Sequence, residues 1–340
     1  MYCMLLMAAA ASPPKIVLAD DGGAGFWLPG TFASFAAAPA EPGWSVETIY
    51  YLSSTSAATH LAVAREIETD RFTPTANAAL FATLNASENQ LFFSPIYTFA
   101  TPVFGAQASV GITALIGQSS NSLAGVLTTG AGPLTVTRLD AISDSAWGIG
   151  DLAPEVTLKW NSSVNNYMIY ATGNVPIGSF DPDRLSNLGL GFAAIDAGMG
   201  YTYFDTQAGH ELSVVTGFTV NFVNPSNNYQ NGVDWHLDWG ASQFLSKQVF
   251  AGVAGYVYKQ ISCDRGSGDE VGCFESQVVG LGPQLGVNFP IGSLEGNLSV
   301  RCYKEFDNEN RPAGLNAWVS LSISPAPKKA SELPPMGIPR

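Results

Sequence analysis

The stretch VVGLGPQLGVNF, residues 278–289, alternates apolar residues with small or polar ones. Every second residue from Val279 to Phe289 is apolar, while the positions between them, from Gly280 to Asn288, hold glycine, glutamine or asparagine. Successive side chains of a β-strand point to opposite faces of a sheet. The stretch therefore predicts a strand with one apolar face and one face of small or polar groups.

Similar segments of strand length recur along most of the chain. Tight connections at 101–103, 161–163, 205–209, 246–247 and 290–292 are each followed by a longer gap. This alternation is typical of outer-membrane barrels, which join their strands by short periplasmic turns and long external loops. The predicted strands cover residues 43–53, 90–100, 104–117, 150–160, 164–175, 189–204, 210–223, 232–245, 248–262, 273–289, 293–304 and 313–324.

We therefore predict an all-β fold, an antiparallel up-and-down transmembrane β-barrel of about twelve strands. A closed barrel is required because lipid cannot satisfy the hydrogen bonds of an open sheet edge. An even strand number places both chain ends in the periplasm. The expected location is the outer membrane of a bacterial cell.

The composition of the 340-residue chain agrees with a barrel, since 46% of residues are hydrophobic and only 13% are charged, against about 25% charged in soluble domains. The uncharged stretch 91–137 is interrupted by proline and glycine, so it does not predict a membrane-spanning helix. A net charge of −13 argues against nucleic acid as a partner. The expected partners are outer-membrane lipid, a small-molecule solute and the barrel assembly machinery.

The regions outside the predicted strands carry separate expectations. Residues 1–19 resemble a signal peptide with a cleavage site after Ala19, although no basic residue precedes the apolar run and a disordered tail is the alternative. We expect residues 20–42 to be an N-terminal periplasmic segment, 43–324 the barrel and 325–340 a disordered proline-rich tail. Residues 54–89 could hold extra strands or an external loop. The stretch 118–145, rich in Gly, Ser and Thr, is interpreted as a long loop folded into the barrel or outward.

The strand pattern also predicts which side chains face lipid and which face the lumen. A charge at a mid-membrane lipid-facing position costs about 2–4 kcal/mol, and none is found on the faces beginning at Leu212 and Phe104, which we expect to meet lipid. The candidates for the lumen lining are Glu155, Lys159, Asp196, Asp234, His236, Asp238, Glu295 and Arg301. Aromatic residues near strand ends are expected at the membrane interfaces, namely Tyr50, Tyr51, Tyr201, Tyr203, Trp235, Trp239, Tyr256 and Tyr258.

Two cysteines, Cys263 and Cys273, bracket a short polar stretch between two predicted strands. In an oxidising compartment they are expected to form a disulfide that holds an exposed loop. The acidic residues between them lack the ligand spacing of a calcium loop. We expect no metal and no cofactor.

A hydrolase has to be weighed, because some barrels of this size cleave phospholipids with a serine and a histidine. The chain has three histidines and lacks a Gly-x-Ser-x-Gly elbow. His236 lies between Asp234 and Asp238 on the predicted inner face, and Ser242 is the nearest candidate nucleophile. A hydrogen-bond network in the lumen explains this cluster better than catalysis, so we predict that the protein is not an enzyme.

Several short motifs from residue 42 to 315 carry a resemblance to a known family. They include Gly150-Asp151-Leu152 with Pro154, Asn187-Leu188-Gly189, the stretch 201–205, and Gly280 to Gly286. In order and spacing the chain resembles the family named for the meta-pathway of phenol degradation. The resemblance implies a bacterial outer-membrane barrel, transporter-like and associated with the degradation of aromatic or hydrophobic compounds. The chain departs from such barrels in ending on Arg340 rather than on an aromatic residue.

The sequence therefore predicts a channel or transporter for small compounds that are hydrophobic or aromatic. A lumen rich in carboxylates favours cations or neutral polar solutes over anions. A structural or adhesion barrel with a closed lumen is the first alternative, and an outer-membrane lipid hydrolase is the second.

Overall fold

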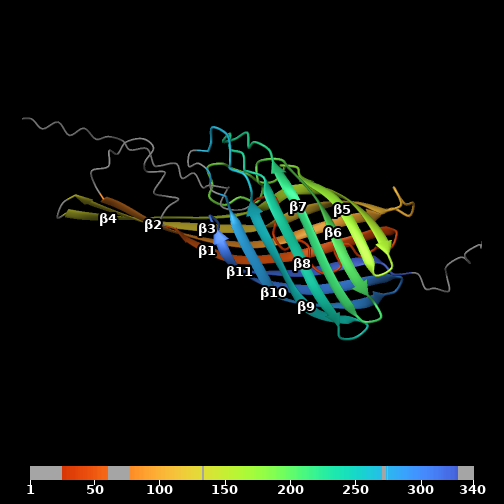
Figure 1. Cartoon of the computed structure of the whole chain (residues 1–340). Helices are drawn as coiled ribbons and strands as arrows, with labels where there is room; N and C mark the ends of the chain where they lie inside the picture. The colour runs from red at the N-terminus through yellow and green to blue at the C-terminus, as the bar shows by residue number, and fades with distance from the viewer. Residues whose placement is uncertain (1–24, 60–76, 132–133, 270–272, 274, 328–340) are drawn as a thin grey trace, which may run out of the picture.

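The computed structural model describes residues 25–59, 77–131, 134–269, 273 and 275–327. Twelve antiparallel strands form a closed barrel in which each strand pairs with its neighbours in sequence and β1 pairs with β12 (Figure 1). The prediction of a twelve-stranded up-and-down barrel is confirmed. Within the described residues, no helix has the length and apolar character needed to cross a membrane. The strands are β1 (Gly43–Thr59), β2 (Asn77–Thr98), β3 (Gln107–Ala131), β4 (Leu134–Ser162), β5 (Asn165–Asn174), β6 (Ala194–Asp205), β7 (His210–Asn221), β8 (Asp234–Phe244), β9 (Val249–Gln260), β10 (Gln277–Ile291), β11 (Leu294–Glu309) and β12 (Ala313–Pro325).

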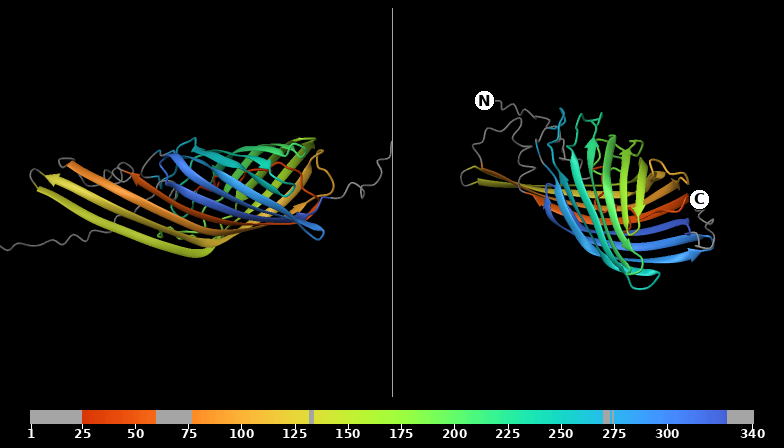
Figure 2. Two further views of the ribbon diagram at one scale, coloured as in Figure 1. Left: turned by 90° about the horizontal axis from the view of Figure 1, so that it is seen from below. Right: turned by 45° about the vertical axis from the view of Figure 1, so that its right-hand side comes forward.

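The two ends of the barrel differ. Short connections such as 163–164 and 292–293 gather at one end, which we call the short-turn end. At the other end, the long-loop end, β2, β3 and β4 run on beyond the barrel wall as a long projecting sheet (Figures 1 and 2). The chain enters the barrel wall at Gly43 and leaves it at Pro325, both at the short-turn end.

The projecting sheet corrects two expectations. Residues 118–145 are not a loop, because β3 and β4 pair continuously from Gln118↔Trp147 to Ala131↔Leu134. The stretch is poor in large apolar residues, yet backbone hydrogen bonds between two long strands need no apolar face. Residues 54–59 and 77–89 belong to β1 and β2, while 60–76 lie outside the described residues.

The two faces of β10 explain its glycines. Leu281 and Leu285 are exposed on the outside of the barrel, whereas Gly280 and Gly286 are buried on the inside. A methyl group added to Gly280 would lie 2.2 Å from the ring of Tyr256, and one added to Gly286 would lie 2.2 Å from the ring of Phe250. The glycine face therefore makes room for aromatic rings that project inward from β9.

This arrangement corrects the expectation that Tyr51, Tyr256 and Tyr258 lie at a membrane interface. All three are buried inside the barrel, in a cluster with Trp318 and with Trp27 from the N-terminal part of the chain. Proximity to a strand end does not fix the side on which a ring lies; the strand parity does. Tyr50, next to Tyr51, is exposed on the outer face.

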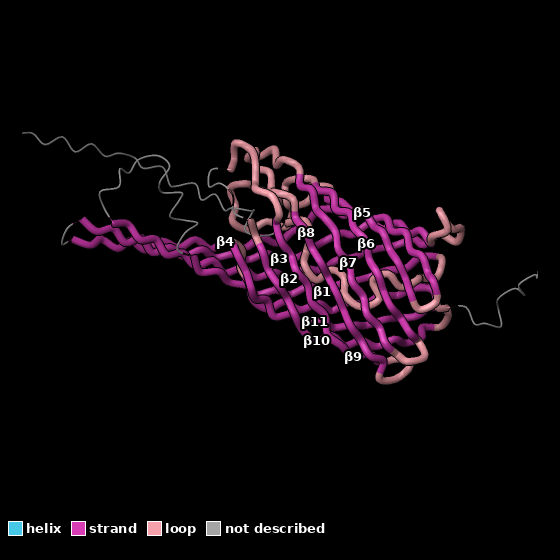
Figure 3. Tube along the Cα trace, in the orientation of Figure 1, coloured by secondary structure: helices cyan, strands magenta, loops and turns pink. Residues whose placement is uncertain are grey.

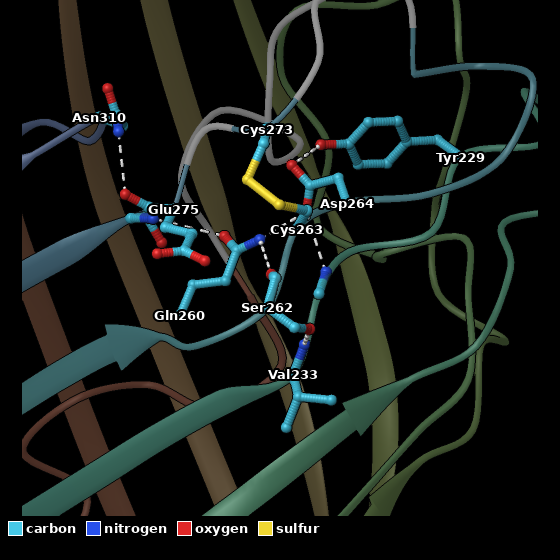
Figure 4. The surroundings of a disulfide bond; sticks show 11 residues. Tyr229, Val233, Gln260, Ser262, Cys263, Asp264, Cys273, Glu275 and Asn310 are labelled. Atoms are coloured by element: carbon cyan, nitrogen blue, oxygen red, sulfur yellow. Dashed lines mark hydrogen bonds between the residues drawn. A yellow bond between two sulfur atoms is a disulfide. The ribbon is translucent and has the colours of Figure 1, made fainter.

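Loops at the long-loop end are tied together around the disulfide between Cys263 and Cys273 (Figure 4). Asp264 accepts hydrogen bonds from the Tyr229 hydroxyl at 2.5 Å and from the Gly232 backbone N–H at 2.9 Å. The disulfide joins two residues of the β9–β10 loop, and Asp264 of that loop holds it against the β7–β8 loop. The candidate signal segment 1–19 and most of the C-terminal tail lie outside the described residues.

Candidate functional site: a lumen filled by the N-terminal segment

Residues 25–42, which we call the lumen segment, lie inside the barrel (Figure 3). This differs from the expectation that residues 20–42 form a segment outside it. The lumen segment has no helix or strand, so its backbone N–H and C=O groups need partners from elsewhere. Inward-facing polar side chains of the wall supply many of them.

Asp238 of β8 is the central anchor. Its carboxylate accepts the backbone N–H of Gly30 at 3.0 Å and that of Phe32 at 3.2 Å. Arg301 of β11, three strands further along the barrel wall, donates to the carbonyl oxygen of Thr31 at 3.4 Å. An acid and a base that the sequence placed in the lumen therefore hold consecutive residues of the lumen segment.

The anchoring continues toward the short-turn end. The backbone N–H of Phe35 donates to Glu211 at 2.8 Å, and that of Ala37 donates to the Thr202 hydroxyl at 3.0 Å. Lys159 donates to the carbonyl oxygen of Ala38 at 3.2 Å. Ser34 is held by Ser242 at 2.9 Å and by Gln284 at 2.7 Å, and Ala40 exchanges two hydrogen bonds with Gln107.

Near the short-turn end, a cage of aromatic rings surrounds Phe35 of the lumen segment. The ring of Phe35 lies 5.1–5.8 Å, centroid to centroid, from the rings of Phe204, Phe244 and Phe250. Phe35 has a φ of 68°, a left-handed conformation that is unfavourable for a bulky residue. Such a conformation persists only when its surroundings impose it, and here the cage and the bond to Glu211 do so.

His236 of β8 lies beside Trp27, in the part of the lumen segment nearest the long-loop end. Its Nε2 atom is 3.1 Å from Asp196 Oδ2 and 3.2 Å from the Tyr170 hydroxyl, and its ring stacks on Trp27 with centroids 3.7 Å apart. Ser242 lies six residues further along the same strand, about 20 Å away at about 3.4 Å per residue. Histidine and serine are therefore not positioned to act together in hydrolysis.

The remaining predicted lumen residues have different surroundings. Asp234 accepts a hydrogen bond from Asn221 at 2.9 Å and is buried. Glu155 lies near Lys159 and near Glu47, an inward acid of β1 that the sequence analysis did not name. Glu295 shares the inner face of β11 with Arg301, and no hydrogen bond joins it to the described part of the lumen segment.

Asp151 of β4 is a structural residue that the candidate set lacked. It accepts the backbone N–H groups of Gly178 and Leu190 at 2.7 and 2.8 Å and the side-chain amide of Asn174 at 2.8 Å. These bonds hold residues 175–193, which we call the clasp loop, against β4. The Gly150-Asp151-Leu152 motif was the signal available in the sequence. The clasp loop comes very close to it, since a methyl group added to Gly178 would lie 2.5 Å from the carbonyl carbon of Gly150.

The clasp loop carries a second attachment to β4. Arg184 donates two hydrogen bonds to the carboxylate of Asp144, at 2.7 and 3.1 Å. This carboxylate raises the pKa of the Arg184 guanidinium above its ordinary value. The clasp loop is thus fixed near its two ends by Asp151 and at its middle by Asp144.

The lumen segment leaves a cavity on each side of itself. A cavity of about 920 Å³, which we call the vestibule, lies toward the long-loop end between the wall, the clasp loop and residues 25–29 of the lumen segment. A smaller cavity of about 310 Å³ lies at the short-turn end and is bordered by Ala37, Gln107 and Lys159. Trp27 to Pro29 therefore form a floor of the vestibule.

The fold is similar to that of a solved outer membrane channel. A crystal structure of an outer membrane channel from Pseudomonas putida F1 matches with a TM-score of 0.60 and 11% identity over 85% of this chain and 98% of that one. A FadL homologue of Pseudomonas aeruginosa matches with a TM-score of 0.39 and 8% identity over 84% and 90%. No curated protein matches the sequence.

The family resemblance of the motifs has a direct counterpart. The model of the family described as "Putative MetA-pathway of phenol degradation" matches residues 69–321, which is most of the barrel. The resemblance inferred from the motifs is confirmed, and the chain belongs to this family.

Proposed function

We propose that the protein is a gated channel of the bacterial outer membrane for small amphipathic compounds, aromatic ones among them. The observation that carries the proposal is the position of the lumen segment, which occupies a closed barrel between two cavities. A barrel with this belt of exposed apolar side chains fits a lipid bilayer. Insertion there requires barrel assembly machinery and lipid as partners.

The mode of attachment favours a gate over a permanent plug. Among the described residues, no disulfide joins the lumen segment to the wall, and its anchors are hydrogen bonds and aromatic contacts. Individual bonds of this kind contribute about 0.5–3 kcal/mol each, so the lumen segment can leave in steps. We infer that solutes cross after the lumen segment shifts from Asp238 and Glu211.

The vestibule suits a small solute with an apolar body. Its volume falls within the range of about 300–1,000 Å³ that is typical of ligand pockets. Its lining combines apolar side chains such as Phe92, Leu115 and Leu188 with polar ones such as Gln90 and Asn121. The family description adds aromatic compounds as the substrate class to test first.

A closed barrel that serves for structure or adhesion is the second candidate. The same filled lumen favours it, together with the sheet of β2, β3 and β4 that projects beyond the wall. The two candidates differ in one property, because only the channel passes solutes.

Solute-induced swelling of proteoliposomes separates them. The purified protein should admit phenyl β-glucoside, an aromatic solute that crosses lipid slowly, faster than raffinose, which is larger and has no apolar body. Liposomes with heat-denatured protein are the control. Equal and negligible swelling in both solutes rejects the channel and leaves the closed barrel.

A further inference from the structure

Arg311, between β11 and β12, borders the vestibule and has unused hydrogen-bond donors. Its guanidinium lies over the ring of Tyr258, 4.9 Å from the centroid. Nε and Nη1 are buried and have no hydrogen-bond partner, and no acid of the described residues forms an ion pair with this side chain. Buried donors without acceptors are unfavourable, so this guanidinium is ready for an acceptor that the protein does not provide.

The acids around the vestibule do not serve as that acceptor. Glu305 accepts the Tyr256 hydroxyl at 2.8 Å and the Gly314 N–H at 2.9 Å. Glu88 accepts the Ser119 hydroxyl at 2.7 Å and the Gln90 amide at 2.9 Å. Arg184, the other arginine of the vestibule, is already paired with Asp144. Arg311 is thus the arginine of the described vestibule lining that has no carboxylate partner.

The surroundings of Arg311 define the ligand that fits. A guanidinium binds a carboxylate through two parallel hydrogen bonds. The apolar lining, which includes Trp27, Leu28, Phe92 and Phe180, suits a ring or short alkyl body. The nearby carboxylates of Glu88 and Glu305 oppose negative charge on the ligand, so one carboxylate paired with Arg311 is favoured over two.

We propose that the vestibule is a binding site for compact monocarboxylates with an aromatic or alkyl body, and that Arg311 binds the carboxylate. This inference rests on the proposed function, since it names the solute class that the entrance selects. It also differs from the expectation that an acidic lumen favours cations, because a single unpaired arginine sets the local preference. A ligand in this site contacts Trp27 to Pro29 and so touches the lumen segment itself.

Isothermal titration calorimetry on the full chain in detergent tests the proposal with benzoate, benzyl alcohol and phthalate. Benzoate should bind more tightly than benzyl alcohol, which lacks the carboxylate, and than phthalate, which has two. Arg311→Gln should weaken benzoate binding at least about tenfold, the size expected for one lost charge-assisted pair. Binding of benzyl alcohol to this variant should stay unchanged. Arg265→Gln, which removes the same charge from an exposed loop residue, is the matched control and should bind benzoate like the wild type.

Unchanged benzoate affinity in Arg311→Gln overturns the proposal, as does equal affinity of the wild type for benzoate and benzyl alcohol. Heat-modifiable mobility on gels shows that each variant has a folded barrel before it is titrated. Binding is measured apart from permeation, so the two proposals can fail separately. Solute permeation without an Arg311 effect rejects the carboxylate site alone, and benzoate binding without any permeation rejects the channel.

Discussion

Substitution of Asp238 by asparagine should loosen the lumen segment by a predictable amount. Asp238 accepts two backbone N–H groups, those of Gly30 and Phe32, at 3.0 and 3.2 Å. The asparagine oxygen can keep one of these bonds, while its amide nitrogen has no lone pair to accept the other. A hydrogen bond to a charged acceptor contributes about 1.5–3 kcal/mol. Release of the lumen segment should therefore become about tenfold to a hundredfold more frequent, since about 1.4 kcal/mol is a factor of ten.

Hydrogen exchange measured by mass spectrometry reads this change directly, because amide exchange reports the free energy of local opening. Peptides covering residues 28–36 should exchange about tenfold to a hundredfold faster in Asp238→Asn than in the wild type. Glu295→Gln is the matched control, as it removes an acid of the inner face that has no hydrogen bond to the described lumen segment. The reasoning is refuted if Asp238→Asn and Glu295→Gln exchange alike, or if the acceleration spreads equally over the barrel strands.

Three further substitutions test other contacts. Phe35→Ala removes the ring from its aromatic cage and should speed amide exchange in residues 33–38. The free energy of local opening should fall by less than the about 3–5 kcal/mol expected for a fully buried phenylalanine, because Phe35 is partly exposed. Unchanged exchange would contradict the role of the cage. Gly280→Val brings a side chain into the Tyr256 ring and should lower the yield of folded, heat-modifiable barrel, whereas Leu281→Val on the outer face should not. Asp151→Ala removes three hydrogen bonds and should make the clasp loop sensitive to limited proteolysis between residues 178 and 190. If the wild type is cleaved there equally fast, Asp151 does not hold the clasp loop.

The barrel could be predicted because its signal is local. A period of two along β10 or β7 is visible within ten residues, and it places Leu285 outside and Gln284 inside without knowledge of any partner strand. The extent of β3 and β4 could not be predicted. Their projecting parts lack a one-sided apolar pattern, and only pairing with each other reveals them as strands.

The lumen segment could not be predicted for a different reason. Residues 25–42 have no periodicity, and their burial depends on contacts across the chain, such as that between Gly30 and Asp238, 208 residues apart. Asp238 and Arg301 were expected to line the lumen as polar groups. In the structure both bind backbone groups of the lumen segment, and these contacts are not visible in the sequence. Asp151 was absent from the candidate set because its role depends on a loop that returns to β4.

The conductance of single proteins in planar bilayers tests most directly whether the lumen segment closes the barrel. The comparison is between the wild type and a variant that lacks residues 25–40, both verified as folded by heat-modifiable mobility. We predict small or rare conductance steps for the wild type and larger, long-lived steps for the deletion, because removal of the lumen segment joins the vestibule to the cavity at the short-turn end. Identical conductance in the two proteins would contradict the account.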